Sequence, residues 1–371
     1  MKKILYAVSF VGICLLLSSW GSKAHRIIND KSAYCYPTTL LFLIPNWTNV
    51  VTANASAADY RKGSDPTEAP KHYIDIDNYP EFIQNGQISQ SFDTLVARYG
   101  YTFVMDQGIL PWATVTAFDS LKACFGRYDW NKAALFAADL GHYLGDEHQP
   151  LHITKNYNGQ LTGQTGLHSR YETTMISKYE QLLVYPPDSV QLIANVSDFV
   201  FSNLYTNYAY VDSVLIADNI AHTIAGNVSS DAYYQALWNE SGAFTIDLLR
   251  RASLSLADLI YTAWVQAGSP LMYPAGLVDP ENPGQTRLLT IFPNPATQII
   301  SFPVVVTSHS EHVTMYIYND NGNLVETMFN GVMEKGTHTI KKDIKNLVAG
   351  VYLCRVKAGN VSSVQRFVVA P

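Results

Sequence analysis

Histidines and carboxylates gather in one short stretch of the chain at spacings that suit metal binding. His142 and Asp146 are four residues apart, and so are His168 and Glu172. Residues four apart lie on one face of an α-helix, so each pair could bind one metal ion from adjacent turns. Imidazole and carboxylate ligands without thiolates are typical of a catalytic zinc site rather than a structural one. The spacing alone leaves two interpretations open, a metal site and an ordinary polar helix face.

These side chains must be positioned by helices, and the spacing of the apolar residues predicts where the helices lie. Apolar residues recur at helical spacing in three segments, 130–144, 169–183 and 243–267. Pro150 ends the first helix and allows His152 to turn toward the second pair. Residues 20–268 lack the regular alternating runs of an all-β protein, so this region is predicted to be mainly α.

A change of composition marks a second region. Residues 269–287 are rich in proline and glycine and have no periodicity, which predicts a linker. From residue 288 to 371, short β-type runs at 304–307, 313–318 and 351–356 alternate with turns such as Asn321-Gly322. The predicted architecture is a mainly α domain followed by a small all-β sandwich.

The first nineteen residues have the pattern of a signal peptide. Lys2 and Lys3 precede an apolar run from Ile4 to Leu17, which is too short to span a membrane as a helix. The mature chain is therefore predicted to be exported. Three cysteines remain after cleavage, so at most one disulfide can form, and either Cys35 bridged to Cys124 or free thiols are open.

Composition restricts the partners. Of the 371 residues, 47% are hydrophobic and 15% are charged, which is typical of a packed globular protein. The net charge of -6 argues against a broad basic groove for duplex nucleic acid. Bound metal ions would add positive charge, so phosphate substrates stay open.

Five segments, taken in this order, resemble the superfamily of zinc-dependent phospholipases C and fungal single-strand (S-one/P-one) nucleases. The segments are 20–25, 57–62, 72–77, 141–152 and 167–172. The resemblance covers most of residues 20–268 and implies the phospholipase C/P-one nuclease-like helical fold. It also implies three Zn²⁺ ions and a mature chain that begins at Trp20.

The resemblance implies a ligand set, and the residues of each site follow. The first zinc would be held by Trp20 (through its free amine and carbonyl), His25 and the bridging Asp146. The second would be held by Asp59, His72, His142 and Asp146, and the third by His152, His168 and Glu172. His148 and His222 have no counterpart in the superfamily and are interpreted as residues that lie on the surface or beside the ligands.

The implied reaction is attack of a zinc-bound hydroxide on phosphorus. Metal coordination lowers the pKa of water from about 16 to about 7, so such a nucleophile exists at neutral pH. The third zinc would stabilise the leaving oxygen. Asp59, Lys62 and Asp146 are the implied catalytic residues, since Lys62 matches a basic position of the nucleases. Arg61 and Lys62 both follow Asp59 closely enough in sequence to reach the phosphate. A solvated basic pair is the alternative for these two cations.

The substrate class divides the superfamily, and this chain carries features of both branches. Tyr73 and Asp75 match positions that stack on and hydrogen-bond a nucleic-acid base. Glu172 and the short loop before His168 are more similar to the phospholipases, and Tyr60 matches one of three positions of a choline pocket. The favoured prediction is a secreted trinuclear-zinc nuclease that cleaves single-stranded nucleic acid or nucleotides. The alternative is a phospholipase C that acts on phospholipid head groups, and a remote one is a non-catalytic surface binding protein.

The C-terminal region resembles the type IX secretion (Por) sorting domain. The resemblance rests on the runs 291–297, 316–322, 347–352 and 367–369 and spans nearly all of residues 288–371. It implies passage through the periplasm to a secreted or cell-surface location, with the type IX secretion machinery as partner. No stable protein partner is predicted. A generic carbohydrate-binding sandwich is the alternative.

Overall fold

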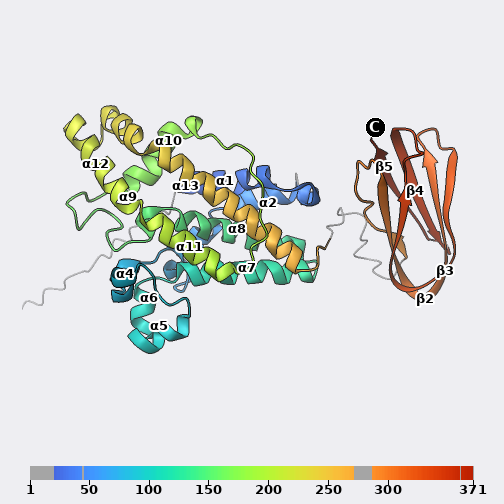
Figure 1. Ribbon diagram of the computed structural model, residues 1–371, viewed down its shortest axis with the longest axis horizontal. Helices are drawn as coiled ribbons and strands as arrows, with labels where there is room; N and C mark the ends of the chain where they lie inside the picture. Colours follow the sequence, from blue (N-terminus) through green and yellow to red (C-terminus); the bar gives the residue numbers. More distant parts are fainter. Residues whose placement is uncertain (1–20, 44–45, 271–285, 360, 371) are drawn as a thin grey trace, which may run out of the picture. The chain divides into compact units, whose positions relative to one another are not determined.

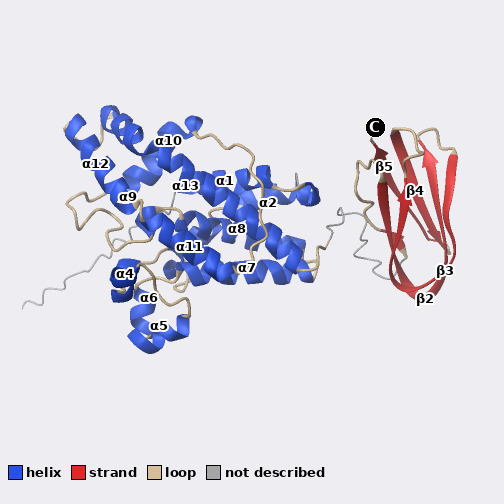
Figure 2. Cartoon of the chain, in the orientation of Figure 1, coloured by secondary structure: helices blue, strands red, loops and turns tan. Residues whose placement is uncertain are grey.

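The chain forms a helical unit and a β-rich unit, which divide after Pro270. The computed structural model describes residues 21–43, 46–270, 286–359 and 361–370 (Figure 1). Figure 2 shows helices before the division and strands after it, which confirms the predicted fold class. The predicted signal peptide, Trp20 and most of the predicted linker lie outside the described residues.

The helical unit contains α-helices joined by short 3₁₀ turns and one π-helix. The α-helices are α1 Gly21–Ser32, α2 Asn46–Ala53, α3 Ala57–Arg61, α4 Pro80–Asn85, α5 Phe92–Tyr99, α6 Tyr101–Asp106, α7 Leu110–Gly126, α8 Trp130–Glu147, α9 Leu167–Ser169, α10 Ile176–Tyr179, α11 Val196–Tyr208, α12 Val211–Ala225 and α13 Asp231–Gln266. The 3₁₀ turns are η1 Ala33–Cys35, η2 Thr38–Leu43, η3 Ala69–His72, η4 Ile76–Asn78, η5 Pro150–His152 and η7 Glu180–Leu182, and the π-helix is η6 Arg170–Met175.

The central helix of this unit is α8, which packs against α1, α2, α7 and α13. Two glycines on α8 allow α1 to approach closely. A Cβ on Gly141 would lie 2.0 Å from Asn29 Oδ1, and one on Gly145 would lie 2.8 Å from His25 Nδ1. Asn29 Nδ2 fixes the contact by donating to the Ala138 and Val51 carbonyls. The close approach places His25 beside the polar end of α8.

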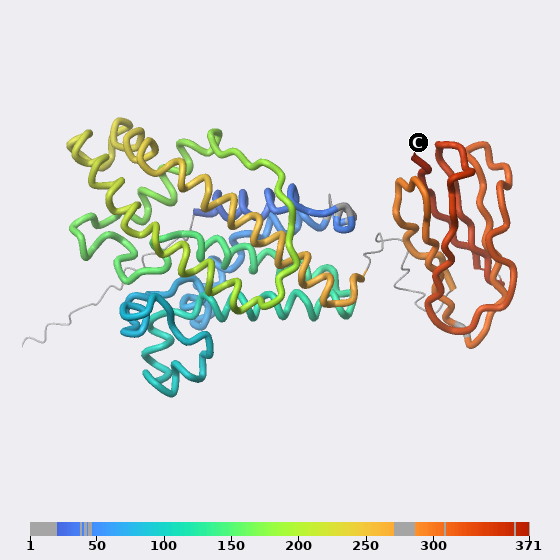
Figure 3. The backbone as a smooth tube through the Cα atoms, viewed as in Figure 1, coloured from blue at the N-terminus to red at the C-terminus, as the bar shows by residue number. Residues whose placement is uncertain are grey.

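Two of the predicted helices are confirmed, with shifted ends. The helix predicted at 130–144 is α8, which is capped by Asp129 and continues to Glu147. The helix predicted at 243–267 is the last two thirds of α13, which begins earlier, at Asp231, after its cap Ser230. In Figure 3, α13 runs along the length of the helical unit.

The single helix predicted at 169–183 is wrong in detail, because this segment is α9, the π-helix η6, α10 and η7 in succession. Arg170 begins the π-helix, and its guanidinium binds outside it. It donates to Asp218 and Tyr233 and to the carbonyls of Gln164 and Thr165. These tertiary contacts, which local spacing does not encode, accompany the departure from regular α-helix.

The β-rich unit is an antiparallel sheet in the order β1-β2-β4-β5, with β3 also paired to β2. Its strands are β1 Arg287–Leu288, β2 Ile299–Asn319, β3 Leu324–Asp343, β4 Gly350–Ala358 and β5 Val361–Val369. The predicted runs 304–307 and 313–318 belong to the one strand β2, whose pairing with β3 is irregular between Val306 and Ser310. Phe302, Ile317 and Phe367 lie in the apolar core of this unit.

The structure also bears on two predictions, that no helix spans a membrane and that the cysteines form at most one disulfide. Within the described ranges, none of the helices has both the length and the apolar character that a membrane crossing needs. The described cysteines are buried free thiols: Cys35, Cys124 and Cys354. Of the two alternatives, a Cys35–Cys124 disulfide and free thiols, the structure has the second.

Candidate metal centre

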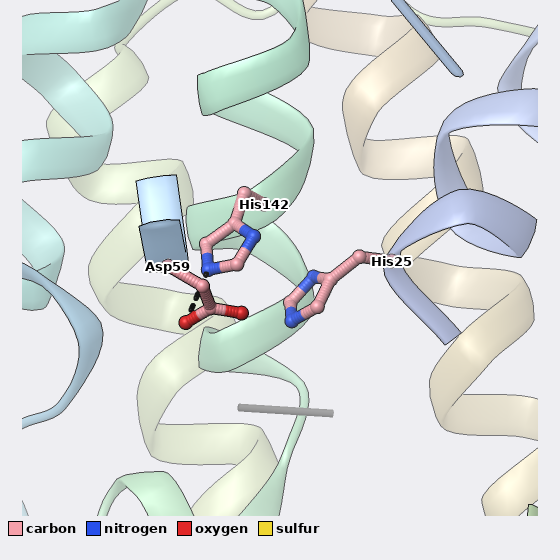
Figure 4. A group of neighbouring side chains, drawn as sticks. All are labelled: His25, Asp59 and His142. Carbon is pink, nitrogen blue, oxygen red and sulfur yellow. Dashed lines mark ion pairs between the residues drawn. The ribbon is translucent and has the colours of Figure 1, made fainter. Parts of the chain in front are cut away.

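The structure brings eight of the predicted ligands together from seven neighbouring segments of the helical unit. His25 comes from α1, Asp59 from α3, His72 from η3, His142 and Asp146 from α8, His152 from η5, and His168 and Glu172 from α9 and η6. Figure 4 shows His25, Asp59 and His142 converging from three helices. Trp20, the remaining predicted ligand, lies outside the described residues.

These side chains form three groups that could each hold a metal ion. In each group the candidate ligand atoms all lie within 4.8 Å of one another. The groups are His25 with Asp59 and His142; His72 with His142 and Asp146; and His152 with His168 and Glu172. In the third group, Glu172 Oε2 lies 3.4 Å from His152 Nε2 and 3.2 Å from His168 Nε2.

Asp146 joins the groups to one another. Its Oδ2 lies 3.0 Å from His72 Nδ1 and 3.3 Å from His142 Nε2. Its Oδ1 lies 3.6 Å from His25 Nε2 and 3.2 Å from His152 Nδ1. Each carboxylate oxygen of Asp146 therefore faces two imidazole rings, and the rings differ between the two oxygens. A carboxylate in this arrangement could bridge two metal ions.

Backbone carbonyls fix the tautomer of three of the histidines. The Nδ1 atoms of His142, His152 and His168 lie 2.8, 2.7 and 2.9 Å from the carbonyl oxygens of Ala55, His72 and Tyr157. Because a carbonyl only accepts, each Nδ1 must carry the proton, and each Nε2 offers a lone pair. This contact is the usual way in which a protein orients a metal-binding imidazole.

The residues fit bound metal ions. His152 Nε2, His168 Nε2, Asp146 Oδ1 and Glu172 Oε1 are buried, and none has a hydrogen-bond partner among the described residues. Buried polar atoms are nearly always partnered, so several orphaned atoms in one cluster indicate a ligand. Imidazole nitrogens with carboxylate oxygens are the donors that zinc prefers in catalytic sites.

The electrostatics of the cluster favour a cation. Burial alone would raise the pKa of the Asp146 carboxyl, but the His142 and His152 rings hold it well below its ordinary value. Burial opposes ionisation of Glu172 also, yet His168 lowers the pKa of this carboxyl to about 2. Burial, followed by His142, lowers the pKa of His25 to about 3. Ionised carboxylates beside a neutral imidazole are the forms that bind metal.

The predicted cations next to Asp59 have different surroundings. Lys62 Nζ lies 2.7 Å from Asp59 Oδ1, at the edge of the cluster. The Arg61 guanidinium instead contacts Asp139 at 3.0 Å and Glu68 at 3.2 Å. The Tyr60 side chain is 78% exposed. Contact of these residues with a substrate stays a prediction.

Tyr73 and Asp75 lie on the segment that follows His72. Tyr73 is half-buried, and its hydroxyl donates to the Asp106 carbonyl at 3.4 Å. Burial, together with the nearby Asp77 charge, raises the pKa of the Asp75 carboxyl to about 7. This segment is tied to the third group, because Ile74 N donates to the His152 carbonyl at 2.9 Å.

The sequence reasoning missed two polar residues that touch the ligands. Gln149 Nε2 donates to Glu172 Oε2 at 3.1 Å, and Glu68 Oε1 lies 3.5 Å from His72 Nε2. Both lie within four residues of a predicted ligand, which is the only signal in the sequence. Of the two interpretations of His148, the surface position is excluded because this residue is fully buried, whereas His222 is exposed on α12.

Comparison with known proteins identifies the C-terminal region. Residues 290–370 match the family model of the secretion system C-terminal sorting domain. A probable serine protease of Bradyrhizobium tropiciagri is 24% identical over 279 residues, which cover 61% of this chain. The matched region is only 35% of that protein, so the chain spans about a third of the length of this relative.

Two solved structures resemble the chain weakly. Alpha toxin from Clostridium absonum has 11% identity and a TM-score of 0.43, and alpha-toxin from Clostridium perfringens has 12% and 0.42. Each comparison covers 94% of this chain and 98% of the other. At these values the likeness assigns no activity to this chain.

The sorting domain, by contrast, confirms the predicted export and the predicted interaction with the secretion machinery. The chain is therefore a secreted or cell-surface protein, and its helical unit carries three groups of side chains that could hold metal ions.

Proposed function

We propose that the helical unit is a zinc-dependent hydrolase of phosphoric ester bonds that binds three zinc ions. The observation that carries the proposal is the set of three ligand groups, buried except for the partly exposed Asp59, that are joined by Asp146. His25, Asp146 and the predicted Trp20 would hold one ion. Asp59, His72, His142 and Asp146 would hold the second, and His152, His168 and Glu172 the third.

Zinc bound at this centre would act as a Lewis acid and bring the pKa of a bound water to about 7. The side chains of the protein orient the substrate, neutralise the charge of its phosphate and leave a path by which it enters. Asp59 is 16% exposed at its side chain, whereas Asp146 and Glu172 are fully buried there. Substrate therefore reaches the cluster on the side of Asp59 and Lys62, where the lysine ammonium can neutralise phosphate oxygens.

Nucleic acid is the first substrate class. Tyr73 offers a partly exposed aromatic ring for stacking on a base. With a pKa of about 7, the Asp75 carboxyl is part protonated at neutral pH, so it can donate to a base edge as well as accept. These two residues support cleavage of single-stranded nucleic acid or nucleotides.

Phospholipid is the second class, and a different set of side chains favours it. Tyr60 is exposed directly after Asp59, and Tyr157 and Leu161 are exposed on the loop between His152 and His168. Exposed aromatic and aliphatic side chains next to the ligands suit an apolar or choline-bearing substrate.

The test uses protein whose N-terminal residue is Trp20. We would measure zinc per chain, then hydrolysis of single-stranded DNA, RNA and phosphatidylcholine vesicles, with a chelated sample as control. About three zinc ions and chelator-sensitive hydrolysis are expected. Cleavage of nucleic acid alone would support the nuclease, and release of phosphocholine alone the phospholipase. Full zinc occupancy without hydrolysis would leave the binding-protein hypothesis, and one zinc or none would overturn the proposal.

A further inference from the structure

Glu68 is a buried carboxylate next to the metal centre that belongs to none of the three ligand groups. It directly precedes η3, four residues before His72, and its side chain is 1% exposed. Three donors hold it in place. Oε1 accepts from Tyr143 Oη at 2.6 Å and from Arg61 at 3.2 Å, and Oε2 accepts from Lys71 Nζ at 2.8 Å.

His72 is oriented differently from the other ligand histidines. His142, His152 and His168 turn Nδ1 to a backbone carbonyl and leave Nε2 for the cluster. His72 instead turns Nδ1 into the cluster, 3.0 Å from both Asp146 Oδ2 and His142 Nε2. To bind a metal ion through Nδ1, the His72 ring must carry its proton on Nε2.

The Nε2 atom of His72 faces Glu68. The distance to Glu68 Oε1 is 3.5 Å, and His72 Nε2 is a buried atom that makes no hydrogen bond among the described residues, so the contact is the electrostatic attraction of a carboxylate for an N–H dipole. A carboxylate in this place favours the tautomer with the proton on Nε2, which leaves the lone pair of Nδ1 for a metal ion. Among the described residues, no backbone carbonyl accepts from His72 Nε2, and the carbonyl of His72 itself accepts from His152 Nδ1 at 2.7 Å.

We propose that Glu68 is a positioning residue of the metal centre, which holds His72 in the Nε2-protonated tautomer and thereby strengthens zinc binding by His72, His142, Asp59 and Asp146. The inference rests on the proposed function only in taking zinc as the bound ion. It also gives Arg61 a part in the site without contact with phosphate, since Arg61 holds Glu68 and Asp139 together.

The experiment compares Glu68→Gln with a matched control, Glu81→Gln. Glu81, on α4, is a carboxylate that likewise accepts from an arginine and a tyrosine, Arg98 and Tyr99. Zinc retained per chain would be measured against increasing concentrations of a competing chelator. We expect one class of zinc to bind about 10- to 100-fold more weakly in E68Q. Retention of the zinc held by His168 and Glu172 reports that the variant is folded, and E81Q should match the native chain.

A second readout is the tautomer itself. Nitrogen NMR of the zinc-loaded native chain should show His72 with a protonated Nε2 and a metal-bound Nδ1, and E68Q should shift the Nε2–H resonance. If E68Q does not fold, Glu68→Asp keeps the charge but withdraws the oxygen from His72, and the same titration should show weaker zinc binding.

Three outcomes would contradict the inference: unchanged zinc affinity in the folded variant, equal weakening in E81Q, or a His72 bound through Nε2. A native chain that binds no zinc would overturn the proposed function instead, so the two failures are distinguishable.

Discussion

Two histidines near the end of α8 share their burial and their backbone hydrogen bond but differ in the side chains that surround them. His142 and His148 are both fully buried. Each has Nδ1 2.8 Å from a backbone carbonyl, that of Ala55 for His142 and that of Leu144 for His148. Each therefore presents the lone pair of Nε2 to the protein interior.

What differs is the charge that faces Nε2. His142 Nε2 lies within 3.6 Å of carboxylate oxygens of Asp59 and Asp146. Burial alone would lower the pKa of His142, but Asp146, Asp59 and the hydrogen bond to the Ala55 carbonyl together raise that pKa. His148 Nε2 has no hydrogen-bond partner within the described part of the chain, and burial with the nearby Arg251 lowers its pKa to about 3.

Glu147 extends this contrast. It directly follows the shared carboxylate Asp146, yet both of its carboxyl oxygens are buried without a hydrogen-bond partner among the described residues. Burial raises the pKa of Glu147 well above its ordinary value. Adjacent positions thus hold an ionised and a neutral carboxyl, so opposing charges, not burial, distinguish a candidate metal site from a polar group in the core.

The largest expected effect comes from replacing the histidine that faces carboxylates. His142→Leu keeps a side chain of similar volume but removes the Nε2 ligand from two of the three groups. Hydrolysis should fall roughly 10³-fold, as when a group that stabilises transition-state charge is removed. Zinc per chain, measured on the same sample, should fall by at least one. Native zinc content in a folded H142L protein would remove His142 from the metal centre.

The sequence predicted the two units because their periodicities differ. Helical spacing before residue 268 and β-type runs after 288 are local properties, and the fold class follows from them. The π-helix at Arg170–Met175 was not predictable, since its accompanying contacts come from Asp218 and Tyr233, far away in the sequence.

The ligand groups were predictable only in part. The pairs His142/Asp146 and His168/Glu172 follow from helical spacing, whereas the placement of Asp59 and His72 rested on the resemblance. Glu68 was missed because an acid among Arg61, Lys71 and a tyrosine resembles a surface charge until packing buries it. The sequence left His148 between a position on the surface and one beside the ligands, because it does not show which residues after a helix end turn inward.

An intermediate effect is expected from Glu147→Gln, which removes the ionisable group and keeps its size. In the unfolded chain Glu147 ionises above pH 4.5, but in the folded chain its raised pKa keeps it protonated. The native chain therefore loses stability as pH rises, by up to about 1.4 kcal/mol per pH unit until the folded pKa is reached. The variant lacks this loss.

The measurement is urea unfolding of native and E147Q protein between pH 5 and pH 8. The difference in the free energy of unfolding should grow with pH in favour of the variant. Other titrating groups, including the ligands, are common to both chains and cancel in this difference. Parallel curves would show that Glu147 has a partner or solvent access and would weaken the contrast with Asp146.

The smallest effect, and the sharpest test of the comparison, is expected from His148→Leu. The substitution loses one hydrogen bond, worth about 1 kcal/mol, and removes a buried Nε2 without a partner, a gain of similar size. The Leu144 carbonyl keeps an acceptor role, because the backbone N–H of residue 148 also donates to it at 3.1 Å. Stability should change by less than about 1 kcal/mol, with zinc content and hydrolysis as in the native chain. If H148L instead lost zinc as H142L is expected to, the charges facing Nε2 would not be what separates the two histidines, and His148 would have to be counted in the metal centre.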